Sequence, residues 1–305
     1  MTSRALLIGA LLLAGTASTL GQGTDSSSSQ PYLVEYIGAK GSGTAGSILQ
    51  NLEQNSDSWF TADNIQPYFI LAFAREDDNA VGSGNFVPHW DSSITPADIA
   101  SFKTSFTNVK FLVSLGGATL TSGANYVWQP QSGDCSSWIA AAAQSVSALI
   151  SEYHLDGIDI DFENFESGDS SFPTCIAGLI NSLQSQGSTE VSIAPFPSIE
   201  SQYAALYKAA SSGICFVNFQ AYAQPAPTGI SGYESLYNSV LNNPYPSSKL
   251  LLGVQTSQAP SDITSIFQDL YSNSLINGAF FFEADDSAPS YSAENSIMQS
   301  LASSS

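Results

Sequence analysis

Basic residues are scarce in this chain of 305 residues. It has seven lysines and arginines against 27 aspartates and glutamates, which gives a formal net charge of −20 at pH 7. A surface of this sign repels the phosphates of nucleic acids and the headgroups of anionic lipids, so neither is expected as a partner. Neutral or weakly charged substrates fit such a surface better.

Histidines, cysteines and long apolar runs are also scarce. The two histidines, His89 and His154, and the three cysteines form no pair with the spacing of metal ligands. No metal site and no other cofactor is therefore expected. After the N-terminal segment, no stretch approaches about 18 uninterrupted apolar residues, so no membrane span is expected.

The N-terminal segment is typical of a secretory signal peptide. Arg4 gives it a positive start, residues 5–14 form a short apolar core, and small residues follow. We expect residues 1–21 to be the signal peptide, residues 22–30 to be a Ser-rich flexible leader, and residues 31–305 to form one domain. This predicts a secreted, extracellular protein, and we expect it to be a monomer.

An odd number of cysteines in an oxidising compartment allows at most one disulfide within the chain. Cys135 lies in a Gly/Ser-rich stretch, Cys175 follows shortly after a proline, and Cys215 begins an apolar run. We expect Cys135 and Cys175 to form the disulfide and Cys215 to be a buried thiol.

Short apolar segments alternate with amphipathic segments from residue 31 onward. The segments predicted to be strands are 32–37, 68–74, 110–115, 157–163, 190–195, 216–222, 250–254 and 279–283. Those predicted to be helices are 96–106, 136–153, 175–186, 200–210, 233–241, 261–271 and 292–301. Repeated strand–helix units predict an α/β fold, a closed (β/α)8 TIM barrel in a single domain. The alternative is an open doubly wound sheet, but Gly38, Gly41 and Gly43 lack the spacing of a nucleotide-binding loop.

The fourth predicted strand carries four carboxylates within eight residues: Asp156, Asp159, Asp161 and Glu163. Side chains alternate across a strand, so the last three share one face and the apolar residues between them share the other. Neighbours on the acidic face stand about 6 to 7 Å apart, and each ionised carboxylate therefore disfavours ionisation of the next. We expect Asp159 and Asp161 to share a proton and Glu163 to keep a raised pKa, which suits a general acid.

A solvated edge strand or a calcium loop would be the alternative to a catalytic role for this acidic strand. A calcium loop needs alternating oxygen ligands around a central glycine, whereas isoleucine and phenylalanine occupy the intervening positions here. These apolar positions indicate burial on both faces, which is typical of a parallel sheet covered by helices. In such folds a carboxylate near the carboxyl end of a strand belongs to the active site, so the catalytic interpretation is favoured.

Residues at the carboxyl ends of barrel strands converge on one mouth. Glu163 ends the fourth predicted strand. Gln220 and Tyr222 end the sixth and share a face, and Phe282 or Glu283 ends the eighth. For Tyr222, core packing is the alternative to a functional position opposite Glu163.

The four carboxylates reproduce the DxxDxDxE signature of glycoside hydrolase family 18, which includes chitinases and endo-β-N-acetylglucosaminidases. Ser114, Gly116 and Gly117 end the preceding strand and resemble the SxGG motif of that family. Gln220 and Tyr222 are similar to the Q-x-Y ending of strand six in its small plant and fungal chitinases. The resemblance covers the chain from residue 31 to the C-terminus.

The resemblance implies a retaining mechanism in which the acetamido oxygen of the substrate, rather than a second carboxylate, attacks the anomeric carbon. Glu163 would protonate the glycosidic oxygen and then activate water. Asp161 would orient the acetamido group and stabilise the oxazolinium, while Asp159 would set the proton balance of Asp161. Tyr222 would donate a hydrogen bond to the acetamido oxygen, and Gln220 would contact the same sugar.

The eighth predicted strand departs from the family pattern. Members usually end it with a tryptophan that forms the floor beneath a sugar, whereas this chain offers Phe282 or, by a one-residue shift, Glu283. Tyr36 and Phe73, in the first two strands, complete the residues expected to bind the substrate. The tryptophans that either line outer subsites or pack internally are Trp59, Trp90 and Trp128.

The implied function is that of a secreted chitinase, which cleaves β-1,4-linked N-acetylglucosamine polymers. Two alternatives remain open: an endo-β-N-acetylglucosaminidase acting on N-glycan cores, and a non-hydrolytic chitinase-like lectin. Lectins of this fold generally lack the acid, and Glu163 is present, but the altered strand eight keeps this alternative open. In every case the expected partner is a glycan that contains N-acetylglucosamine.

Overall fold

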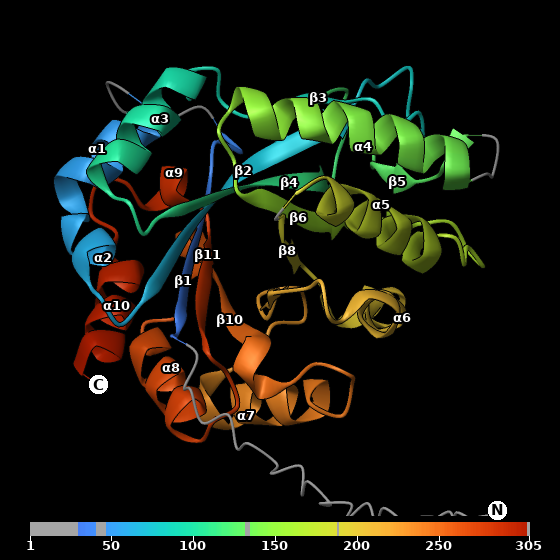
Figure 1. Cartoon of the computed structure of the whole chain (residues 1–305). Coiled ribbons are helices and arrows are strands. Elements are labelled where there is room, and N and C mark those ends of the chain that lie inside the picture. The colour runs from blue at the N-terminus through green and yellow to red at the C-terminus, as the bar shows by residue number, and fades with distance from the viewer. Residues whose placement is uncertain (1–29, 41–46, 132–134, 188, 304–305) are drawn as a thin grey trace, which may run out of the picture.

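The computed structural model describes residues 30–40, 47–131, 135–187 and 189–303. The expected signal peptide and the expected leader up to residue 29 lie outside this part of the chain. The described residues form a closed barrel of eight parallel strands surrounded by helices (Figure 1). The predicted (β/α)8 fold is therefore confirmed.

All eight predicted strands are present, in the order predicted. Around the barrel they are β1 (Tyr32–Ile37), β2 (Gln66–Glu76), β4 (Lys110–Gly117), β6 (Gly157–Phe162), β8 (Glu190–Ile193), β9 (Phe216–Phe219), β10 (Leu250–Gln255) and β11 (Gly278–Phe282). Strand β1 pairs in parallel with both β11 and β2, which closes the barrel. The carboxyl ends of all eight strands consequently lie at one mouth.

The helices pack outside the barrel and complete the repeated units. They are α1 (Ile48–Asn55), α2 (Asp57–Thr61), α3 (Pro96–Ser105), α4 (Cys135–Glu152), α5 (Phe172–Gln186), α6 (Glu200–Ala210), α7 (Gly229–Val240), α8 (Ile263–Ser272), α9 (Ala284–Ser287) and α10 (Ser292–Ser303). Short 3-10 turns lie at η2 (Pro197–Ile199), η3 (Ser247–Lys249) and η4 (Thr256–Gln258). None of the helices that the structure describes is both long enough and apolar enough to cross a membrane.

The short elements were not predicted from the sequence. These are α1, α2 and α9, together with the strands β3 (Phe86–Pro88), β5 (Val127–Trp128) and β7 (Asn164–Phe165). A strand of two or three residues, or a helix of four or five such as α9 and α2, is too short to show a hydrophobic period; α1 has eight residues and was missed although it is longer. Strand β3 pairs antiparallel with β2, and β5 pairs with β7, so these additions extend the loops at the barrel mouth.

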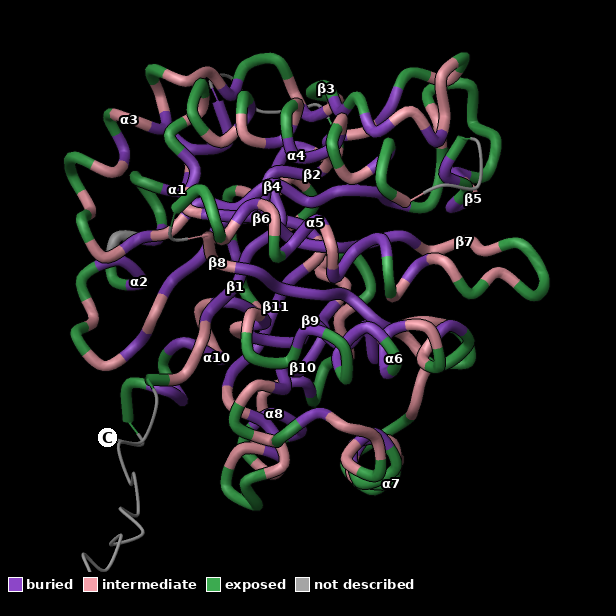
Figure 2. Tube along the Cα trace, turned by 45° about the vertical axis from the view of Figure 1, so that its right-hand side comes forward, coloured by how far each residue is buried: buried purple, intermediate pink, exposed green. Residues whose placement is uncertain are grey.

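The apolar side chains form two layers separated by the barrel wall. The larger layer lies between strands and helices and includes Ile158, Ile160 and Phe162 of β6. The smaller layer fills the barrel and includes Val34, Ile70 and other strand residues. Every residue of β6 is buried, as predicted from its sequence, and Figure 2 shows the barrel strands as the buried centre of the molecule.

Strand β9 is shorter than predicted. It ends at Phe219, because the chain then turns: the Ala221 N–H donates a hydrogen bond back to the Phe219 carbonyl at 2.8 Å. Gln220 and Tyr222 therefore lie on a turn after the strand rather than on its last residues. The turn places both side chains at the mouth of the barrel.

The cysteines and tryptophans contribute to the framework. A disulfide joins Cys135 and Cys175, the pairing favoured by the sequence, and ties the start of α4 to α5. Cys215 is a free thiol that is partly exposed rather than buried as expected, because it precedes β9 at the end of the barrel opposite the mouth. The tryptophans considered for outer subsites are all buried, so packing is their role: Trp59, Trp90 and Trp128.

Candidate active site

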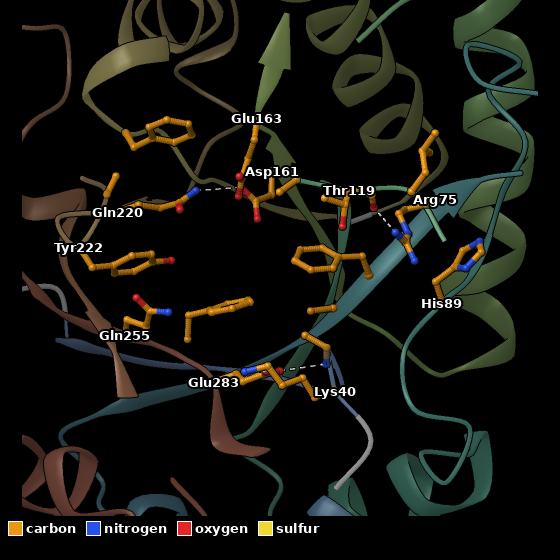
Figure 3. A pocket seen from close by; sticks show the side chains of 18 of the residues that line it. Lys40, Arg75, His89, Thr119, Asp161, Glu163, Gln220, Tyr222, Gln255 and Glu283 are labelled. Atoms are coloured by element: carbon orange, nitrogen blue, oxygen red, sulfur yellow. Dashed lines mark hydrogen bonds and ion pairs between the residues drawn. The ribbon is translucent and has the colours of Figure 1, made fainter. Parts of the chain in front are cut away.

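A cleft of about 800 Å³ opens at the carboxyl ends of the barrel strands. The predicted site residues that line it are Phe73, Asp161, Glu163, Gln220, Tyr222, Phe282 and Glu283. Figure 3 shows Asp161 and Glu163 side by side, with Gln220 and Tyr222 close to them on one side of the cleft. Residues from strands β2, β6 and β11 and from the turn after β9 are thus brought to one place.

Asp159 lies beneath the cleft and is fully buried. Its carboxylate accepts hydrogen bonds from the Tyr36 hydroxyl at 2.9 Å, the Ser114 hydroxyl at 2.7 Å, the Ser192 hydroxyl at 2.6 Å and the Asn218 amide at 3.3 Å. Burial raises the pKa of Asp159, and these hydrogen bonds oppose that rise. The four donors therefore favour a negative charge directly below Asp161.

Tyr36 supports Asp159 instead of lining the cleft, where sequence analysis placed it. The side chain is only 1% exposed, and its ring packs edge-on against Phe282 at 5.8 Å between centroids. Sequence analysis also missed Ser192 and Asn218. Asn218 stands two residues before Gln220 in an apolar strand, and this alternation was the available signal that both side chains face the barrel interior.

Asp161 is the next carboxyl toward the mouth. It is 4% exposed and accepts a hydrogen bond from the Gln220 amide at 3.0 Å. The same amide donates to the Ala194 carbonyl at 3.0 Å, which fixes its orientation. Burial, and then the charges of Glu163 and Asp159, raise the pKa of Asp161 well above its usual range, so Asp161 holds a proton under conditions that ionise ordinary aspartates.

Glu163 follows directly after β6 and is partly exposed in the cleft. Burial raises its pKa, and a nearby Gln220 amide opposes the rise. Tyr222 is also partly exposed, and burial together with the neighbouring carboxyls raises the pKa of its phenol well above the usual range. Burial therefore favours the protonated form of both groups that face the cleft, an acid and a phenol.

The SxGG residues bring β4 close to β6. Gly116 has φ +125°, and a Cβ atom there would lie 2.5 Å from the Asp161 carbonyl oxygen. Gly117 has φ +88°, and a Cβ atom there would lie 3.1 Å from the Phe73 ring. The two glycines thus allow β4 to reach β6 on one side and Phe73 to enter the cleft on the other.

Asp156 lies at the opposite end of β6. Its carboxylate accepts hydrogen bonds from the Phe111 backbone N–H and the Lys103 ammonium, both at 2.8 Å. It therefore ties α3 and β4 to β6 and has no contact with the cleft.

The two candidates at the end of β11 have different positions. Phe282 is partly exposed in the cleft, and its ring centroid lies 6.3 Å from that of Phe73. Glu283 is 0% exposed; it accepts the Ala39 N–H at 3.0 Å and lies 3.4 Å from the Lys40 ammonium. Phe282 therefore presents the aromatic surface, and Glu283 binds the turn that follows β1.

Several cleft residues carry no sequence motif and were missed. Lys40, Arg75, His89 and Gln255 line the cleft from loops and strand ends (Figure 3), and Gln258 lines it as well. Arg75, which follows Ala74 near the end of β2, donates to the Thr119 carbonyl. Only the length of β2 beyond the predicted strand brings it to the mouth.

The structure is a (β/α)8 barrel in which a row of carboxyl groups leads into a cleft at the carboxyl ends of the strands. This is where proteins of this fold carry their active sites. The family model described as "Glycosyl hydrolases family 18" matches residues 53–291. The chain belongs to glycosyl hydrolase family 18.

Chitinases are among the proteins similar to this chain. Chitinase 1 of Tulipa saxatilis subsp. bakeri is 34% identical over 251 residues, which cover 77% of this chain and 79% of the relative. The catalytic domain of a family GH18 chitinase from the fern Peteris ryukyuensis is 36% identical with a TM-score of 0.78, covering 89% of this chain and 99% of that one. A family 18 chitinase from Crocus vernus is 28% identical with a TM-score of 0.77 and the same coverage.

Proposed function

We propose that this protein is a chitinase, which hydrolyses β-1,4-linked N-acetylglucosamine polymers with Glu163 as general acid and base. The observation that carries the proposal is the difference among the carboxyls of the described cleft lining. Asp161 is 4% exposed and Glu283 is 0% exposed, whereas Glu163 is partly open to the cleft. Glu163 is thus the carboxyl that a glycosidic oxygen can reach.

A single accessible carboxyl among the described residues of the cleft lining favours a substrate-assisted retaining mechanism. The Glu163 O–H donates its proton to the leaving glycosidic oxygen, while the acetamido oxygen of the substrate bonds to the anomeric carbon and gives an oxazolinium. Glu163, now ionised, removes a proton from water, which opens the oxazolinium with retention. No enzyme carboxylate forms a bond to the sugar in this scheme.

Asp161 and Tyr222 have the protonation states that this scheme needs. The carbonyl oxygen of the protonated Asp161 accepts the acetamido N–H of the substrate, and the negative charge favoured at Asp159 stabilises the positive oxazolinium from below. The phenol of Tyr222 stays protonated, so it can donate to the acetamido oxygen. Phe73 and Phe282 provide apolar surface for a sugar face.

The chitin substrate and an extracellular location have separate support. The similar proteins from tulip, fern and crocus are named as chitinases. The disulfide between Cys135 and Cys175 fits an oxidising compartment, as does the signal peptide expected at residues 1–21.

Replacing the acid tests the proposal. We expect Glu163→Gln to lower the rate of chitooligosaccharide hydrolysis by about 10²- to 10⁴-fold, because the amide cannot donate the proton, while oligosaccharide binding by calorimetry persists. Glu152→Gln, the same change at an exposed position on α4, is the matched control and should leave the rate unchanged. Equal rates for Glu163→Gln and wild type would contradict the assignment.

Product analysis separates the candidate activities. Wild-type protein is incubated with N-acetylglucosamine oligomers and, in parallel, with a high-mannose glycoprotein. Shorter oligomers that are first released as the β-anomer support a retaining chitinase, whereas release of mannose-rich glycans alone indicates the N-glycan enzyme. Binding of oligomers with no cleavage of either substrate would overturn the enzymatic proposal and leave a lectin.

A further inference from the structure

Two carboxylates after β11 bind the backbone of the turn after β1. The Gly38 N–H donates to the Asp285 carboxylate at 2.8 Å, and the Ala39 N–H donates to the Glu283 carboxylate at 3.0 Å. We call this pair of side chains, with the turn they hold, the mouth clamp. It joins the ends of the first and last barrel strands, which are neighbours in the sheet, at the mouth of the barrel.

The turn in the mouth clamp forms part of the cleft wall. Ala39 and Lys40 both line the cleft, beside Phe282. The Lys40 ammonium lies 2.6 Å from the Asp286 carboxylate and 3.4 Å from that of Glu283, so its side chain is also tied to the segment after β11 (Figure 3). The position of this wall relative to Phe282 therefore depends on the contacts with Glu283, Asp285 and Asp286.

Other carboxyl groups face the mouth clamp from each element packed around it. Glu35 on β1 is 2% exposed, and neither of its carboxyl oxygens has a hydrogen-bond partner. The further acidic neighbours are Asp91 after β3, Asp286 on α9 and Glu294 on α10, and Lys40 is the cation that pairs with the clamp. These groups are not arranged as metal ligands in the described part of the chain.

We propose that Glu283 and Asp285 are positioning residues for hydrolysis: they hold the turn 38–40 as the wall that confines a sugar above Phe282. The inference rests on the proposed function, because the wall formed by the turn 38–40 belongs to the cleft in which hydrolysis is proposed to occur. Neither side chain reaches the reacting atoms, so loss of either changes how well the substrate is held rather than the proton transfer itself. Loss of either side chain should consequently raise KM more than it lowers kcat.

Because the mouth clamp is surrounded by acidic groups, the strength of its hydrogen bonds to the turn depends on pH. Burial, followed by the charge of Asp285, raises the pKa of Glu283 to about 7, and burial raises the pKa of Asp285 to about 6. An ionised carboxylate accepts backbone hydrogen bonds more strongly than a protonated one, and it pairs with Lys40. The clamp therefore tightens as the pH rises through these values and loosens as the pH falls through them.

Substitutions at Asp285 separate positioning from mere structural support. We expect Asp285→Ala to raise KM for an N-acetylglucosamine tetramer about five- to tenfold with kcat changed less than about twofold, because a charge-assisted hydrogen bond to the wall is lost. Asp285→Asn keeps an oxygen that can accept the Gly38 N–H, and it should recover most of the affinity. Asp262→Ala, at an exposed position before α8, is the control.

A pH series tests the clamp without catalysis. The dissociation constant of the tetramer is measured from pH 5 to 8 for Glu163→Gln and for Glu163→Gln with Glu283→Gln, because Asp161 titrates in both proteins and cancels in the comparison. We expect binding of the first to tighten more steeply with pH than binding of the second. Parallel curves, or an Asp285→Ala variant with an unchanged KM, would overturn the proposal.

Amide exchange reports on the clamp even if the protein does not bind this substrate. Exchange at Gly38 and Ala39, followed by mass spectrometry, should be faster in Asp285→Ala than in wild type, and Asp285→Asn should lie between them. Equal exchange in all three proteins would reject the clamp. Faster exchange without any binding of the tetramer would instead reject the proposed substrate and retain the clamp.

Discussion

Three carboxyl groups along β6 and just after it have three different surroundings. Asp159 accepts four hydrogen bonds inside the barrel, Asp161 accepts one from Gln220, and Glu163 opens to the cleft. Asp159 has the most donors and therefore the best stabilised ionised form, whereas burial and the charges of its two neighbours favour the protonated form of Asp161. The order of the side chains along the strand thus sets where the protons stay, with the negative charge deepest and the proton donor outermost.

Replacing the middle carboxyl tests this order. Asp161→Asn removes a carboxyl whose ionisation is coupled to that of Glu163, so the alkaline limb of the pH–rate profile should change shape and follow the ionisation of Glu163 alone. The maximal rate should also fall about 10²-fold or more, because the group that positions the acetamido oxygen is altered. An unchanged pH–rate profile would contradict the coupling between these two carboxyls.

At the scale of the elements, the close approach of β4 and β6 determines where Asp161 stands. Gly116 pairs with Asp161 in the sheet register, and the space beside it is too small for a methyl group. Lys40, by contrast, reaches the cleft from the turn that follows β1. A rigid acid strand is therefore combined with a wall built from turns.

A single methyl group at this contact should have a large effect. Gly116→Ala places a Cβ 2.5 Å from the Asp161 carbonyl at a φ of +125°, so we expect the free energy of unfolding to fall by about 2 to 4 kcal/mol and hydrolysis to weaken. Gly187→Ala is the matched control, because nothing lies within 4 Å of its Cβ position. Similar denaturation midpoints for the two variants would show that β4 can shift without cost.

The elements also show how far the sequence could predict the structure. The eight strands and the acidic face of β6 followed from apolar runs and from alternation, which are local properties of the chain. The hydrogen bonds from Ser192 and Asn218 to Asp159 did not, because they depend on which strands become neighbours on closure of the barrel. The same holds for Lys40 and Glu283, which are 243 residues apart in sequence (283 − 40) and meet only across β1 and β11.

At the scale of the whole molecule, most buried acids of the described residues lie outside the ion pairs found there: Glu283 is paired with Lys40, whereas acids such as Glu35 and Glu294 are not. Burial raises the pKa of Glu35, Asp161 and Glu294 among others, while the chain carries a formal charge of −20 at pH 7. A carboxyl whose pKa is higher in the folded state than in the unfolded state binds more protons when folded. Its contribution to stability is therefore lost as the pH rises from the unfolded value toward the folded one.

Thermal unfolding should show that stability falls as the pH rises. We expect the melting temperature to be several degrees higher at pH 5 than at pH 8, since Glu283 and Asp285, with pKa values of about 7 and 6, lose their protons between these conditions. Glu35→Gln removes one buried acid without changing its size and should flatten the dependence, as measured by calorimetry at both pH values. A melting temperature that rises toward pH 8 would contradict the argument.

The free thiol is a site for chemical labelling at the end of the barrel opposite the cleft. Cys215 is partly exposed and lies where β9 begins, whereas the cleft lies where the strands end. The other two cysteines are joined in a disulfide and do not compete for a thiol reagent. A fluorophore or surface linker attached at Cys215 would therefore orient the barrel with its cleft facing away from the attachment point, toward an insoluble polymer brought up from solution.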